Sequence, residues 1–278
     1  MIFGSESARR SPFALLARCL GDKAIRNAIG MIGGKSRPMY ALDGERMLTA
    51  WERGREQREP WRALALLQVA LPEWDIGALA ALPLVERNAL LLRLRAMTFG
   101  GRIEGFAVCP ECGEQLQFVV NVADLERELR APCEESWLEA ETEMRMRPVN
   151  SSDLAASMAA DGDAQARELL LERTLILPQP ANIESPQPQH TQRSDWLARF
   201  ERLNASAEIR CLLPCAACGA RPVLDLDIAG FVWREVALAA RRLLTEIHRL
   251  ARAYGWSQQA IAAMSTPRRA AYLEMLDA

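Results

Sequence analysis

The chain has 278 residues, of which 50% are hydrophobic and 25% are charged, and its net charge is −2. This composition is that of a globular protein and excludes a disordered chain. No apolar run approaches the roughly 18 residues that a membrane span needs. The start of the sequence lacks the apolar core of a signal peptide, so we expect a cytoplasmic protein with no membrane partner.

The cysteines and the distribution of charge argue against two further classes of protein, disulfide-stabilised proteins and nucleic-acid-binding proteins. Seven cysteines, an odd number, argue against a disulfide framework and favour reduced thiols with a metal. Residues 123–172 hold 13 acidic residues against 5 arginines, whereas residues 231–278 hold 7 arginines against 4 acidic residues. An acidic segment beside a mildly basic tail lacks the concentrated basic surface that is typical of nucleic-acid binding.

The N-terminal part of the chain is predicted to be helical after a short lead-in. Residues 1–40 show little sustained periodicity, so we expect them to be loosely ordered. Apolar residues at helical spacing predict helices over 42–70, with Pro60 in the first turn of the second one. A further helix is predicted over 83–101, where two glycines end the pattern. These helices and the strand that follows them make up residues 41–123.

The first of two cysteine knuckles, Cys109-Pro-Glu-Cys112-Gly113, comes next. Two intervening residues let both sulfurs turn toward one point, and the glycine tolerates the positive φ of a tight turn. Apolar residues then alternate with polar ones, which predicts a strand. The alternating residues are Leu116, Phe118, Val120 and Val122.

Residues 124–208 are predicted to be an acidic, mainly helical insertion. Ser152 is predicted to cap a helical stretch that continues, after a break, to Leu175. Residues 177–193 are rich in proline and glutamine, so we expect an extended linker there. Ser194 is predicted to cap another short helix before the chain returns to the ribbon.

The second knuckle, Cys215-Ala-Ala-Cys218-Gly219, repeats the first, and alternating Leu224, Leu226 and Ile228 follow it. Aligning the first cysteines also aligns the second cysteines, the glycines and the strand residues. More than a hundred residues separate the knuckles, whereas ordinary ribbons have about 15–20, so the intervening segment is interpreted as an insertion that folds by itself. We therefore predict one split zinc ribbon with one structural Zn²⁺ ion per chain. Its ligands are Cys109, Cys112, Cys215 and Cys218.

Three other interpretations of the knuckles are a disulfide within each pair, two exposed thiol pairs, and a redox pair. A thioredoxin-like pair should open a helix after a strand, whereas each pair here is followed by a glycine and an alternating strand. The remaining cysteines, Cys19, Cys133 and Cys211, show no matching pattern and are interpreted as ordinary thiols.

Residues 209–278 contain the second half-ribbon and the C-terminal helices. The longest predicted helix carries one apolar stripe from Val232 to Tyr254 and ends at Gly255. Short helices are predicted to begin at Ser257 and at Thr266, which precedes a proline. The predicted fold is mainly α, within the α+β class: a helical protein with a small split zinc-ribbon β element and a helical insertion.

Four segments resemble a known family. They are 231–235 (FVWRE), 241–257 (RRLLTEIHRLARAYGWS), 268–276 (RRAAYLEML) and 106–113 (FAVCPECG). They are similar to the baseplate proteins of T4-like contractile phages, often labelled baseplate hub assembly chaperones, which are also encoded in phage-derived contractile injection clusters. The resemblance runs from about Trp51 to the C-terminus. The second knuckle lacks the family's proline after its first cysteine, which removes no metal ligand.

The resemblance implies a non-enzymatic role as a structural subunit or an assembly chaperone of the baseplate of a contractile, phage tail-like injection system. The implied partners are other baseplate or hub proteins, which the chain would meet in the cytoplasm during particle assembly. Aromatic and arginine residues suit such contacts. The candidates are Trp233, Arg241, Arg242, His248, Tyr254, Trp256, Arg268, Arg269 and Tyr272.

The alternative function is that of a zinc-ribbon regulator that binds nucleic acid, which the four-cysteine site and the C-terminal arginines would suit. Only Arg102, Arg210 and Arg221 are basic close to the knuckles, so a nucleic-acid partner is not expected. An enzyme is not expected either, because four thiolates close the coordination shell of a metal. His190 and His248 are the only histidines that could act as bases, and we expect no small-molecule substrate.

Overall fold

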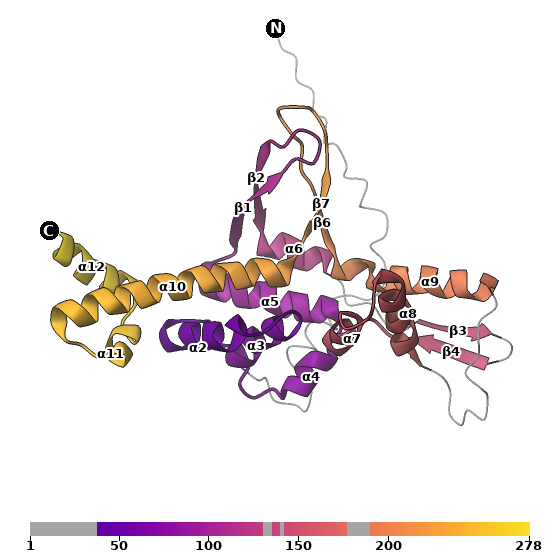
Figure 1. The fold of residues 1–278 in the computed structure, drawn as a ribbon, viewed down its shortest axis with the longest axis horizontal. Coiled ribbons are helices and arrows are strands. Elements are labelled where there is room, and N and C mark those ends of the chain that lie inside the picture. The colour runs from indigo at the N-terminus through magenta and orange to yellow at the C-terminus, as the bar shows by residue number, and fades with distance from the viewer. Residues whose placement is uncertain (1–37, 130–134, 140–141, 177–189) are drawn as a thin grey trace, which may run out of the picture. The chain divides into compact units, whose positions relative to one another are not determined.

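The computed structural model describes residues 38–129, 135–139, 142–176 and 190–278. Almost all of the predicted lead-in and most of the predicted proline- and glutamine-rich linker lie outside the described residues. Helices predominate and the strands form short antiparallel pairs, which confirms the predicted mainly α fold with a small β component (Figure 1).

Helices alternate along the described chain with three small antiparallel sheets. The first part contains α2 (Gly44–Arg55), α3 (Trp61–Ala70), α4 (Ile76–Ala81), α5 (Leu84–Phe99), β1 (Arg102–Val108), β2 (Gln115–Asn121) and α6 (Val122–Glu128). The middle part contains β3 (Glu135–Glu139), β4 (Thr142–Met146), α7 (Ser151–Ser157), α8 (Asp163–Thr174), β5 (Leu175–Ile176), α9 (His190–Asn204) and the 3₁₀ turn η1 (Ala205–Ala207). The last part contains β6 (Ile209–Leu212), β7 (Val223–Leu226), α10 (Ile228–Tyr254), α11 (Gln258–Ala262) and α12 (Thr266–Asp277).

The main core lies where α10 packs against α2, α3 and α5. Helix α3 has few polar residues and is buried over most of its circumference, as an apolar helix must be. Helix α10 buries one stripe at spacings of three and four residues and ends at Gly255, whose φ of 69° is left-handed. The buried residues of α10 include Val232, Val236, Ala240, Leu243, Ile247 and Leu250.

The β1–β2 and β6–β7 hairpins are structural copies of each other. In the first, Ile103 pairs with Val120, and in the second Ile209 pairs with Leu226. The interval that separates Cys109 from Cys215 also separates these pairs, so both hairpins have the same register around their knuckles. Each hairpin leads directly into a helix, α6 or α10. They form two separate two-stranded sheets rather than one continuous ribbon.

The segment between the hairpins has its own small core. It packs Met144 and Met146 of β4 against Leu171 of α8 and Trp196 of α9. A three-stranded antiparallel sheet with the order β3-β4-β5 belongs to this segment. The prediction of a helical insertion did not include these strands. The first helix is capped by Asn150 in a capping box with Asp153, and not by the predicted Ser152.

Buried polar side chains connect this segment to α5. Arg87, whose exposed fraction is 5%, lies with a guanidinium nitrogen 3.5 Å from the hydroxyl oxygen of Ser151 at the start of α7. Asn88 donates a hydrogen bond of 3.0 Å to the carbonyl oxygen of Ala207. These contacts bring the end of the middle segment back to α5, next to the start of β6.

Candidate metal centre

The first knuckle is a tight turn at the tip of the β1–β2 hairpin. The backbone N–H of Cys109 donates to the carbonyl oxygen of Glu114 at 2.8 Å, and Gly113 N–H donates back to Cys109 at 2.9 Å. Gly113 has a φ of 77°, a conformation that side chains with a Cβ rarely adopt. The turn therefore holds the cysteines at its two ends on one side of the hairpin tip.

The second knuckle has the same geometry at the tip of the β6–β7 hairpin. Cys215 N–H donates to the carbonyl oxygen of Ala220 at 2.8 Å, and Gly219 N–H donates to Cys215 at 3.0 Å. Gly219 has a φ of 75°. Alanine in place of the proline of the first knuckle leaves this pattern unchanged, because neither intervening residue takes part in these hydrogen bonds.

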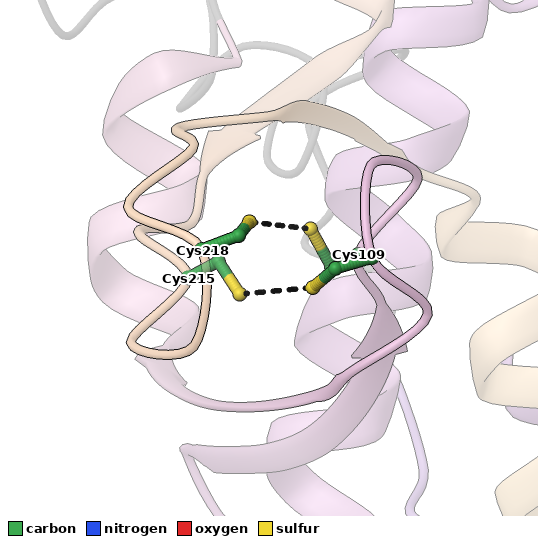
Figure 2. Close-up of side chains that lie close together, drawn as sticks. Cys109, Cys215 and Cys218 are labelled. Carbon is green, nitrogen blue, oxygen red and sulfur yellow. Dashed lines mark hydrogen bonds between the residues drawn. The ribbon is translucent and has the colours of Figure 1, made fainter.

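The four knuckle sulfurs form one cluster, with every sulfur within 4.8 Å of the other three. Cys109 Sγ lies 3.8 Å from Cys218 Sγ (Figure 2). Cys112 Sγ lies 3.6 Å from Cys215 Sγ. Both contacts join one hairpin to the other. All four cysteines are free thiols in the structure, and these separations are far longer than the 2.05 Å or so of a disulfide bond.

Half of the cluster is buried and half is accessible. Cys109 and Cys215 are buried against Leu116, whereas Cys112 and Cys218 are exposed. A backbone hydrogen bond from Cys218 lowers the pKa of the Cys215 thiol to about 7. The backbone of Glu114 favours the thiolate of Cys112, but hydrogen bonds with the neighbouring sulfurs raise its pKa to about 12. The contacts within the cluster thus favour the thiolate of Cys215 and disfavour that of Cys112.

The donor set fits a tetrahedral metal ion. Zinc–thiolate bonds of about 2.3 Å place neighbouring sulfurs of a tetrahedron about 3.8 Å apart, close to the separations of Cys109 from Cys218 and of Cys112 from Cys215. Four sulfurs with no nitrogen or oxygen donor among them suit zinc in a closed, structural site. Cys211 lies in β6, outside this cluster. Within the described part of the chain, no second group of candidate ligands comes together in this way.

The C-terminal residues predicted to contact partners fall into separate environments. Tyr254, Trp256 and Tyr272 form an aromatic cluster, with the first two rings stacked at 4.5 Å. The ring of Trp233 lies against Gly54 of α2, with the guanidinium of Arg62 4.9 Å from its centre. Its position thus depends on internal packing.

The arginines and the histidine that were predicted to contact partners also differ in their environments. Arg241, Arg242, His248 and Arg268 are exposed. The exposed fraction of Arg269 is 6%, and its guanidinium donates to Glu246 at 2.8 Å and also to the carbonyl oxygen of Met264. Arg269 therefore connects α12 to α10 and is not available at the surface. Residue type alone could not separate it from its exposed neighbour.

Comparison with known proteins gives one family match. Residues 66–173, less than half of the 278-residue chain, match the family described as T4 bacteriophage base plate protein. The matched region runs from α3 through the first hairpin to α8 and includes Cys109 and Cys112. The match supports a phage baseplate protein family for this chain. Searches of the curated proteins and of the solved structures found no match.

Proposed function

We propose that the chain is a non-enzymatic structural or assembly protein of the baseplate of a contractile, phage tail-like injection system. The family match over residues 66–173 carries this proposal. Its partners would be other baseplate or hub proteins, which it would meet in the cytoplasm while the particle is assembled. None of the described helices has the length and apolar character to cross a membrane.

One structural zinc ion per chain is part of the proposal. The four-sulfur cluster supports it, because the only described groups that converge there are thiols at separations suited to a closed tetrahedral shell. A closed shell leaves no position for substrate, so the metal would stabilise the two hairpins rather than catalyse a reaction. The zinc would also bring α6 and α10, which follow the two hairpins, into a fixed relation.

The C-terminal helices are proposed as the surface that contacts partners. The exposed arginines and the aromatic cluster are the residue types that dominate the binding energy of protein interfaces. Trp233 and Arg269 would act from inside by holding α10 and α12 in place. The proposed contact residues are Arg241, Arg242, His248, Tyr254, Trp256, Arg268 and Tyr272.

Deletion of the gene from its native cluster, followed by electron microscopy of the particles, tests this function. We expect particles that lack a complete baseplate, and rescue by the wild-type gene. Mass spectrometry of finished wild-type particles then separates a retained subunit from a transient chaperone. Complete, contractile particles from the deletion strain would contradict the proposal.

A further inference from the structure

The outer face of α10 is a straight seam of exposed residues. It lies opposite the buried stripe and repeats at spacings of four and three residues, the heptad spacing of helices that pack along each other. From Arg234 to Arg252 the seam is about 27 Å long at 1.5 Å per residue. Its members, all exposed, are Arg234, Leu238, Arg241, Thr245, His248 and Arg252.

The seam is cationic because the acidic residues of α10 form ion pairs inside the protein. Glu235 accepts two hydrogen bonds of 2.9 Å from Arg95 of α5. Glu246 accepts one of 2.8 Å from Arg269 of α12. Both glutamates face the packed side of the helix and are mostly buried. Intramolecular ion pairs thus remove the negative charge of α10 from the side that faces solvent.

The seam arginines have no such partners in the part of the chain that the structure describes. Arg234, Arg241 and Arg252 form no ion pair within the described residues. Nearby Arg249 differs, since it pairs with Asp277 of α12. Leu238, 68% exposed, lies between the first two seam arginines. The outer face of α10 thus presents an exposed leucine between arginines that have no ion-pair partner among the described residues.

We propose that the outer face of α10 binds an acidic α-helix of a partner protein, with carboxylates opposite Arg234, Arg241 and Arg252 and an apolar residue opposite Leu238. This inference rests on the proposed function, because the partner would be a baseplate protein. A straight seam with heptad spacing fits a helix that runs along it. Positive charge on one face and negative charge on the other steer association and fix the register.

A helix suits this surface better than nucleic acid. The seam has three arginines in a chain whose net charge is −2, whereas nucleic-acid binding domains carry a concentrated basic footprint. An exposed leucine in the middle of the seam finds no apolar contact on a phosphate backbone. It does find one on an amphipathic helix, where apolar and acidic side chains lie on the same face.

Two labelled peptides of about four heptads test the inference by fluorescence anisotropy with the full chain. One carries glutamate and leucine at its a and d positions, and the other has glutamine in place of glutamate. We expect the acidic peptide to bind at least about ten-fold more tightly at low salt, and to lose this advantage at high salt. Equal affinity for the two peptides, or tighter binding of a short DNA duplex, would overturn the inference.

Matched triple variants locate the binding surface. The triple variant with Arg234→Glu, Arg241→Glu and Arg252→Glu should bind the acidic peptide at least about ten-fold more weakly. A control triple has the same change of charge at exposed arginines away from the seam: Arg53→Glu, Arg58→Glu and Arg93→Glu. It should change the affinity for the acidic peptide less than about two-fold. Equal loss in both triples would overturn the inference. Circular dichroism checks the folding of each triple, and the Arg→Gln triple replaces a variant that does not fold.

Capture of co-expressed baseplate proteins separates this inference from the proposed function. If the wild-type chain and the seam triple capture the same subunits equally well, the inference fails and the proposed function stands. If the wild-type chain captures none, the proposed function fails, and the peptide measurements still decide whether the seam binds an acidic helix.

Discussion

The Sγ atoms of Cys109 and Cys218 lie 3.8 Å apart although 109 positions separate them in the sequence. Such a contact closes a long loop, and the entropic cost of loop closure grows only slowly with loop length. The segment between the hairpins can therefore be large and have its own core without weakening the site. A metal ion at this point would hold two hairpins that share no strand pairing.

The first prediction is that the purified chain contains about one zinc ion, and that Cys112→Ser removes it. Because metal-binding energy is folding energy in a structural site, we expect a loss of about 3 kcal/mol or more, or about 6–12 °C in the melting temperature of a chain of this size. Cys211→Ser is the control, since Cys211 lies outside the cluster. Equal zinc content and melting temperature in the two variants would refute a shared site.

Local patterns in the sequence were sufficient to predict the strand after each knuckle and the convergence of the four knuckle cysteines. Each knuckle is a short motif whose glycine and following strand are encoded within a dozen or so residues. Apolar residues follow Cys109 and Cys215 at equal spacing. This spacing predicted that the strands after the two knuckles have the same register relative to their cysteines. The long helix α10 was predictable for the same reason, because its buried stripe is strictly periodic.

Features that depend on distant partners could not be predicted. Strand β4 is short and lies in an acidic segment, so its alternation is clear only once its pairing with β3 and β5 is known. The sequence does not reveal that Arg269 forms an ion pair with Glu246 of another helix. Arg269 was therefore predicted to contact partners together with the exposed arginines. The cationic seam of α10 does have a signal in the sequence, because Arg234, Arg241 and Arg252 belong to a row of residues spaced four and three apart.

The second prediction concerns the ion pair between Arg95 and Glu235. The side chain of Arg95 is 5% exposed and binds Glu235 through two nitrogens, and a third nitrogen donates to the carbonyl oxygen of Arg102 at 2.7 Å. Arg95→Met leaves the carboxylate of Glu235 and the carbonyl groups of Gly100 and Arg102 without their donor, which should cost about 3 kcal/mol in the free energy of urea unfolding. Arg93→Met, on the exposed side of α5, should cost less than about 0.5 kcal/mol. Similar losses in both variants would show that the ion pair adds nothing.

The third prediction concerns Asp153, which is fully buried and accepts hydrogen bonds from Arg147 at 2.6 Å and from Arg173 at 2.9 Å. Burial by itself would raise the pKa of this carboxyl, but the hydrogen bonds from Arg147 and from the Asn150 backbone outweigh it and lower the pKa below 3.8. Asp153→Asn should cost about 3 kcal/mol at pH 7. The exposed Asp163→Asn should cost less than about 0.5 kcal/mol.

The pH dependence of the Asp153 variant follows from the direction of the shift. Because the pKa is lower in the folded state, the carboxylate contributes its full stability above the unfolded value of 3.8. That contribution is lost as the pH falls through the lowered pKa. Urea unfolding at several pH values should therefore show the difference between wild type and Asp153→Asn shrinking below about pH 4. A difference that stays constant to acid pH would mean that the carboxylate is not preferentially ionised in the fold.

The last prediction concerns Glu59, just before α3, where both carboxylate oxygens are buried without a hydrogen-bond partner among the described residues. Burial raises the pKa of Glu59, and the positive charge of Arg87 offsets this only in part. Because the pKa is raised in the folded state, the stability of the fold falls as the pH rises from the unfolded value of 4.5 through the folded-state pKa. Below 4.5 the side chain is neutral in both states and costs no stability.

Glu59→Gln keeps the shape of the side chain and removes its charge, so it should raise the melting temperature at pH 7.5. The gain over wild type should disappear as the pH falls toward 4, where both side chains are neutral. Glu52→Gln, an exposed change on α2, controls for the loss of one negative charge and should shift stability by less than about 0.5 kcal/mol. A lower melting temperature for Glu59→Gln at pH 7.5 would mean that attraction to Arg87 exceeds the cost of burying the carboxylate. In that case the pair would stabilise the junction between α3 and α5.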